Sequence, residues 1–171
     1  GEEDLEETLW ALADKAGAQL WMEACQVNGI EGNSRLELAS CEELVLGTLP
    51  PSRSVLEEAL EMCKPERIHV VGLPPATADL EGFTRRLLGL CKHAIRSGKA
   101  APLSKLAAAM GHEERTVRLG LRWLEEHGQI QAVDVEEGLS IKPGSGLGEA
   151  DPPTERALRE ALQETRAYRK Y

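Results

Sequence analysis

Three arginines on one predicted helix are the residues of this chain best suited to chemistry, and that chemistry is the binding of phosphate. Arg115, Arg118 and Arg122 are spaced by three and four residues, so they fall within an arc of about 60° on a helix. Guanidinium groups bind phosphate through paired hydrogen bonds. Trp123 lies beside this row, and a flanking aromatic ring can stack on an unpaired base. The spacing predicts a nucleic-acid contact, with a protein-docking face and a solvated structural face as alternatives.

Further basic residues precede this row along the chain. The stretch 85–122 holds nine basic and two acidic residues, although the net charge of the whole chain is −9. Because salt screens charges beyond about 10 Å, the local sign of a surface decides what it attracts. Residues 1–63 hold 14 acidic and 3 basic residues, which limits how strongly duplex DNA could be held. The predicted contact surface consists of Arg85, Arg86, Lys92, Arg96, Lys99, Arg115, Arg118, Arg122 and Trp123.

Catalytic and metal-binding patterns are not found in the sequence. The four histidines, at positions 69, 93, 112 and 127, have no HxH or HExxH spacing, and surface or capping roles are expected for them. No nucleophile with a neighbouring base stands out, so we expect no catalytic residue, metal or cofactor in this chain. The cysteines at positions 25, 41, 63 and 91 form no CxxC pair and predict buried free thiols in a reducing cytoplasm.

The element pattern around the arginine row resembles a winged helix. The spacing predicts a helix over 79–97, a short helix over 103–110 that Gly111 ends, and a second helix over 113–128. Alternating apolar and polar residues over 130–141, around Glu136, Glu137 and Gly138, predict a hairpin. Helix, turn, helix and hairpin together outline a winged helix. Arginines on the outer face of its second helix could enter a groove or meet phosphates.

The first half of the chain predicts a small parallel α/β domain. A helix over 4–15, strands over 18–25 and 35–39, and a strand–helix–strand unit from 44 to 71 are expected. Pro50 and Pro51 follow the strand at 44–46 where a phosphate-binding turn would need glycines, so a nucleotide site is not expected. A small-ligand pocket at a switch point of the sheet stays open as an alternative.

The predicted fold class is therefore α/β plus α: a small parallel-sheet domain at 1–75, a winged-helix domain at 76–143, and a linker with a C-terminal helix at 144–171. No stretch approaches the roughly 20 apolar residues of a membrane span, and no signal peptide is evident. No membrane contact and a cytoplasmic location are expected. Gly1 in place of a methionine suggests a fragment of a longer protein.

The order of these features is similar to the C-terminal region of bacterial RecJ-type (DHH family) single-strand-specific DNA exonucleases. Three segments carry the resemblance: EELVLGTLPPS, RIHVVGLPPATADLEGFTRRLLGL and ALREALQETRAYRKY. It covers about residues 43–171. The sequence departs from the family at Thr48, where an aspartate is common, and at LEEHGQIQ, which lacks the expected aromatic residues.

The resemblance implies an accessory role in DNA repair and recombination. The parent enzyme would degrade single-stranded DNA with a metal-dependent core upstream in the same chain, and this region would hold single-stranded DNA or a replication-repair protein. No catalytic residue carries over. Two alternatives remain: a stand-alone winged-helix transcription regulator that reads duplex DNA, and a pure protein-interaction domain.

Overall fold

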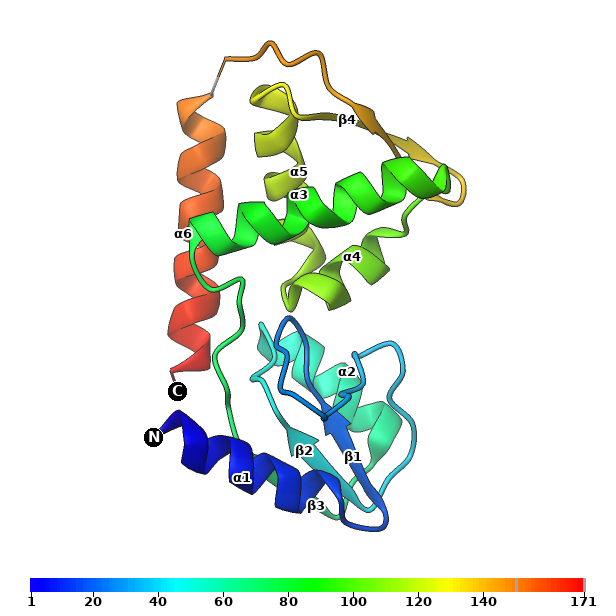
Figure 1. Cartoon of the computed structure of the whole chain (residues 1–171), viewed down its shortest axis with the longest axis vertical. Helices are drawn as coiled ribbons and strands as arrows, with labels where there is room; N and C mark the ends of the chain where they lie inside the picture. The colour runs from blue at the N-terminus through cyan, green and yellow to red at the C-terminus, as the bar shows by residue number, and fades with distance from the viewer. Residues whose placement is uncertain (150, 171) are drawn as a thin grey trace. The chain divides into compact units, whose positions relative to one another are not determined.

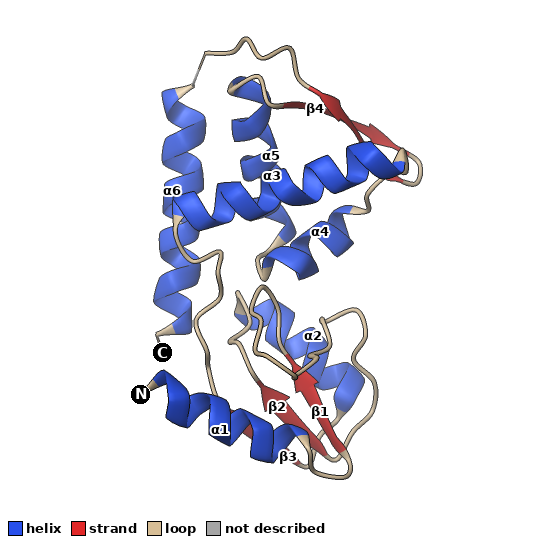
Figure 2. Cartoon of the chain, viewed as in Figure 1, coloured by secondary structure: helices blue, strands red, loops and turns tan. Residues whose placement is uncertain are grey.

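The computed structural model describes residues 1–149 and 151–170. Within these residues the chain is mixed α/β, with six helices, a three-stranded parallel sheet and a two-stranded hairpin (Figure 1, Figure 2). The chain divides into two compact units, Gly1–Pro75 and Ala76–Tyr171, called unit 1 and unit 2 below. Ala150, in the predicted linker, and Tyr171, at the end of the predicted last helix, lie outside the described residues.

Unit 1 is built on a parallel sheet with the strand order β1-β2-β3. Its elements are α1 (Glu2–Ala13), β1 (Ala18–Trp21), β2 (Glu43–Leu46), α2 (Arg53–Cys63) and β3 (Arg67–Val70). The central strand β2 carries the apolar run, and all three of its apolar residues are buried. The predicted strand–helix–strand unit is confirmed, because β2 and β3 are parallel and joined by α2.

Two apolar clusters cover the two faces of this sheet, because side chains of a strand alternate between faces. Leu9 of α1 packs with Leu20 and Val45 on one face. Ala59 and Cys63 of α2 belong to the cluster on the other face. The helix α2 begins at an N-cap, where the Ser52 hydroxyl accepts a hydrogen bond from the amide of Val55, as expected for serine at this position.

The edge of the sheet differs from the sequence prediction in two places. The predicted strand over 35–39 is wrong: residues 35–37 form a turn, in which a Glu37 carboxylate oxygen accepts the Ser34 amide at 2.9 Å. The strand β3 forms as predicted, but it lies at the edge of the sheet, alternates polar with apolar residues, and leaves Ile68 46% and Val70 63% exposed. Apolar pattern does not distinguish a covered strand from an uncovered edge strand.

Unit 2 contains α3 (Leu80–Ser97), α4 (Leu103–Met110), α5 (Glu114–Glu126), β4 (Ile130–Val135), β5 (Gly138–Pro143) and α6 (Pro152–Arg169). The three predicted helices α3, α4 and α5 are confirmed to within a few residues. Asp79 caps α3 by accepting the Gly82 amide at 2.8 Å. Gly111 adopts φ 65° at the end of α4, a left-handed conformation that glycine accommodates without strain.

One apolar core joins all the elements of unit 2. Phe83 and Leu87 of α3, Leu121 of α5 and Leu158 of α6 are all buried in it. The helices α3 and α5 cross closely at Gly120, where an added Cβ would lie 2.5 Å from Cε1 of Phe83. The C-terminal helix α6 is thus part of this core and packs against α5.

The predicted hairpin is confirmed as β4 and β5, which pair antiparallel around a two-residue turn at Glu136 and Glu137. The segment between α3 and α4 joins the hairpin, because Ala101 and Leu139 exchange two backbone hydrogen bonds of 2.8 Å. No helix among the described residues is long and apolar enough to cross a lipid bilayer.

Candidate nucleic-acid interface

The outer face of α5 presents the arginine row to solvent. The inner face of this helix is buried and carries Val117, Leu121 and Leu124. Gly120, on the same side, contacts α3. At about 100° per residue, the three arginines lie on the side opposite Gly120. Arg115 and Arg118 are exposed in 65% and 55% of their side-chain surface. The inner face fixes the helix in the core, so the arginines are held on a rigid support.

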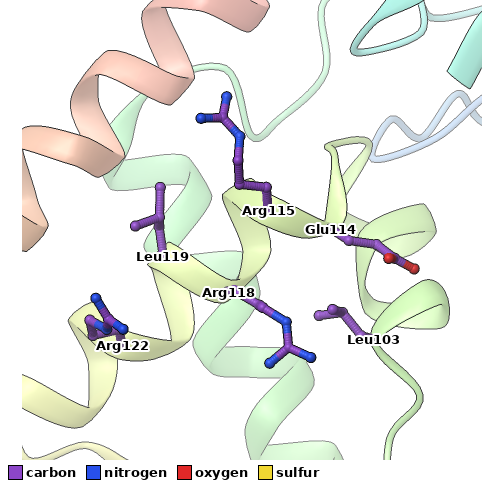
Figure 3. Close-up of a pocket in the computed structure, with 6 residues that line it drawn as sticks. All are labelled: Leu103, Glu114, Arg115, Arg118, Leu119 and Arg122. Atoms are coloured by element: carbon purple, nitrogen blue, oxygen red, sulfur yellow. The ribbon is translucent and has the colours of Figure 1, made fainter. Parts of the chain in front are cut away.

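A surface pocket of about 430 Å³ lies over this face (Figure 3). Arg118 extends from α5 toward Leu103, the first residue of α4, whereas Arg115 extends from the other flank of the helix (Figure 3). The pocket combines guanidinium groups with two leucine side chains. Its lining residues are Leu103, Glu114, Arg115, Arg118, Leu119 and Arg122.

Two of the arginines pair with carboxylates from neighbouring elements. Nη2 of Arg115 lies 3.1 Å from Oε2 of Glu164 on α6, and Nη2 of Arg118 lies 3.4 Å from Oδ1 of Asp134 on β4. Both carboxylates are about as exposed as the arginines, and exposed pairs of this kind are weak. Among residues 1–149 and 151–170, no ion-pair partner within 4.0 Å is found for Arg122. These acids escaped the sequence prediction because they are 49 and 16 residues away along the chain.

The basic residues of α3 do not join this row. Arg85, Lys92 and Arg96 are exposed on the side of α3 opposite its buried stripe, and Lys99 is exposed just after the helix. Because α3 and α5 pack through their buried faces, their basic rows lie on opposite outer sides of the helix pair. Arg86 is half-buried, and its Nε donates to the carbonyl of Ala109 at 2.9 Å. The nine predicted contact residues therefore do not form one continuous surface.

Trp123 is held within unit 2. Its ring stacks on His127 with centroids 3.7 Å apart, and its Nε1 donates to Oε1 of Glu155 on α6 at 3.3 Å. The side chain is half-buried against the core of unit 2. A ring with one face on His127 has less surface to offer a base, so apolar contact in the pocket comes from Leu103 and Leu119 instead.

The histidines fall into different environments. His127 is the C-cap residue of α5, as expected for a capping histidine. The prediction of a surface or capping role is wrong for His112, which is buried, makes an edge-on contact with Phe83, and hydrogen bonds through Nε2 to the Thr77 carbonyl at 2.9 Å. The turn between α4 and α5 is therefore fixed to the segment before α3. No cluster of three or more metal-ligating side chains occurs among the described residues.

The cysteines are free thiols, as predicted, but only Cys63 and Cys91 are buried. Burial raises the pKa of the Cys91 thiol to about 12. Burial, and then the neighbouring Cys41, raise the pKa of the Cys63 thiol to about 11. Both thiols are thus protonated at neutral pH, which favours a packing role over nucleophilic chemistry.

At the carboxyl ends of the strands in unit 1 there is a buried ion pair that the sequence did not reveal. Glu23, which follows β1, is 5% exposed and binds Arg35 at 2.6 Å, besides accepting the Arg35 amide at 2.7 Å. The hydroxyl of Thr48 accepts the Glu23 amide at 2.9 Å. These polar groups bind one another, and they fasten the loop after β1 to the end of β2.

Comparison with models of known protein families, with curated proteins and with solved structures finds no match to this chain.

Proposed function

We propose that this chain is a non-catalytic accessory module of a RecJ-like single-strand-specific DNA exonuclease, and that unit 2 is a winged-helix domain that binds single-stranded DNA. The observation that carries the proposal is the arginine row on the solvent face of α5, which lines a pocket together with Leu103 and Leu119. The order α3, α4, α5, β4, β5 and the strand-like pairing of Ala101 with Leu139 support the winged-helix assignment.

The charges around α5 favour a single strand over a duplex. A recognition helix in a major groove brings its flanking elements against the phosphates on both sides. Here those flanks carry Asp134 on β4 and Glu164 on α6, and the hairpin turn consists of Glu136 and Glu137. Acidic flanks repel a duplex backbone, whereas a single strand can follow the arginine row alone. This arrangement weighs against a transcription regulator that reads duplex DNA.

Binding of labelled oligonucleotides tests this assignment. Anisotropy titrations at low salt should show that a 15-nucleotide single strand binds more tightly than a duplex of the same length. Replacing all three arginines by glutamine should weaken binding and flatten its salt dependence, which is near −0.7 per phosphate contacted on single strands. An unchanged affinity in this triple variant at low salt would refute the assignment.

The accessory role has a separate test in the natural gene. If the chain belongs to a larger nuclease, the reading frame ahead of Gly1 should encode a DHH-type catalytic core. A reading frame that begins directly before this segment would leave a free-standing DNA-binding protein and would refute the accessory role.

Contact with a replication-repair protein is a second function that one observation favours. The edge strand β3 exposes Ile68 and Val70, and Met62 at the end of α2 is 55% exposed. Unit 1 also carries 15 acidic and 5 basic residues, so it would attract a basic partner and repel nucleic acid. Val70→Lys should weaken binding of a purified repair partner without changing oligonucleotide affinity. If Val70→Lys binds that partner as tightly as the wild type does, the edge strand β3 is not the contact surface.

A further inference from the structure

Carboxylates surround the arginines of the α5 pocket: Glu114 lines it, and two others bind its arginines from neighbouring elements. Asp134 and Glu164 come from different elements, β4 and α6, and each binds a different arginine of the same row. Both carboxylates are mostly exposed, with 72% and 68% of their side-chain surface in solvent. Neither is fixed in a buried network, so an incoming anion can replace either one.

We propose that the α5 pocket is the phosphate-binding site for a single strand, and that Asp134 and Glu164, by pairing with Arg118 and Arg115, compete with the strand's phosphates. This inference rests on the proposed function and assigns it to one face of unit 2. The two carboxylates keep affinity low, so that a strand can move past the site rather than stay bound.

The geometry sets how much of a strand the pocket can hold. From Arg115 to Arg122 the helix rises roughly 10 Å, at about 1.5 Å per residue. With phosphates about 3.4 Å apart along the axis of a stacked strand, this length covers about three phosphate spacings, and the three arginines can each meet one phosphate. Leu103 and Leu119 supply apolar surface beside the guanidinium groups and can contact sugars without reading base edges. We therefore expect binding that does not depend on the base sequence.

The existing ion pairs favour phosphate over an acidic protein segment as the occupant. A peptide carboxylate would replace Asp134 or Glu164 with a group of the same kind, so the exchange gains little. A nucleic-acid strand presents linked phosphates that meet several arginines together and releases condensed counterions, which a short peptide does not. Arginine also forms paired hydrogen bonds with phosphate oxygens.

Four versions of the full chain test the proposal by anisotropy with labelled dT15 at several salt concentrations. These are the wild type, Arg118→Gln/Arg122→Gln in the pocket, Arg85→Gln/Arg96→Gln on α3 as a control with the same charge change, and Asp134→Asn/Glu164→Gln. All substituted side chains in the three variants are exposed, so the fold should persist, and circular dichroism checks this.

We expect the pocket variant to lose at least about tenfold in affinity and to reduce the salt slope by about 1.4, for two phosphate contacts. The α3 control should change affinity by less than about threefold. Coulomb's law in water gives about threefold for one carboxylate roughly 7 Å from a phosphate, so Asp134→Asn/Glu164→Gln should tighten binding about three- to tenfold.

Three results would overturn the proposal while leaving single-strand binding by the chain intact. These are equal losses in the pocket and α3 variants, no gain in Asp134→Asn/Glu164→Gln, or displacement of dT15 from the pocket by a glutamate-rich peptide at similar concentration. If neither the wild type nor Asp134→Asn/Glu164→Gln binds dT15 at low salt, the proposed single-strand function fails together with this site.

Discussion

Substituting Gly120 by alanine should destabilise unit 2, against the usual effect of this change in a helix. The new Cβ would lie 2.5 Å from Cε1 of Phe83 and 2.7 Å from Cδ2 of Leu87. Both of these side chains are completely buried, and the Phe83 ring also contacts His112 edge-on. Because both side chains are packed inside the core, α3 and α5 must separate to admit the methyl group.

The size of the effect follows from two opposing terms. Overpacking of a core costs about 1–3 kcal/mol, and two simultaneous contacts place this site near the upper end. Alanine in a helix recovers about 1 kcal/mol relative to glycine. The net loss is about 2 kcal/mol, which lowers the melting temperature of a domain of this size by about 10 °C.

Urea and thermal unfolding of the full chain, followed by circular dichroism at 222 nm, measure this loss, because four of the six helices in the described residues belong to unit 2. Gly89→Ala is the matched control: Gly89 lies on the exposed side of α3, and an added Cβ meets nothing within 4 Å. It should stabilise the protein by up to about 1 kcal/mol. If Gly120→Ala stabilises the protein as much as Gly89→Ala, the close crossing of α3 and α5 is wrong.

Three further predictions concern the cores and the buried charges. Arg35→Met should destabilise unit 1 by about 3 kcal/mol in urea denaturation, because the buried Glu23 carboxylate loses the guanidinium that neutralises it and keeps only backbone donors; a double variant that also replaces Glu23 by Leu should recover part of the loss. Leu158→Ala should cost about 2–5 kcal/mol, since Leu158 is completely buried in the core; a loss below 1 kcal/mol would mean that α6 is only loosely attached. The pKa of the Cys91 thiol, about 12 against an ordinary 9.0, means that the unfolded chain loses this proton first as the pH rises. Stability should therefore fall between pH 9 and 12, and urea midpoints of Cys91→Ala should fall less steeply over that range than those of the wild type.

Local signals in the sequence predicted most of the elements. The limits of α3 and α4 follow from Asp79 and from Gly98 and Gly111, since caps act over a few residues. The hairpin follows from the alternation of apolar and polar residues on either side of the turn at Glu136 and Glu137. In these segments the periodicity and the turn residues agree with the structure, so little tertiary information was needed.

What the sequence did not predict depends on contacts between distant segments. The exposure of Ile68 and Val70 is decided by what packs on β3, and a short apolar run does not show this. The prediction of a strand over 35–39 was wrong for the same reason. The Arg35 side chain binds the Glu23 carboxylate, which lies 12 residues earlier in the chain, and local sequence does not show this contact. For the candidate site, the arginine row was predictable from helical spacing. Its carboxylate partners and its separation from the bases of α3 were not, because they depend on how the helices pack.

The burial of α6 has a consequence for how the protein is made. Unit 1 contains all of its core residues before position 76, so it can fold while later residues are still being synthesised. Unit 2 begins its core at Phe83 but completes it with Leu158 and Leu162. Until those leucines leave the ribosome, the apolar side of α5 that they cover stays open to water, and a chain truncated before α6 would be prone to aggregate.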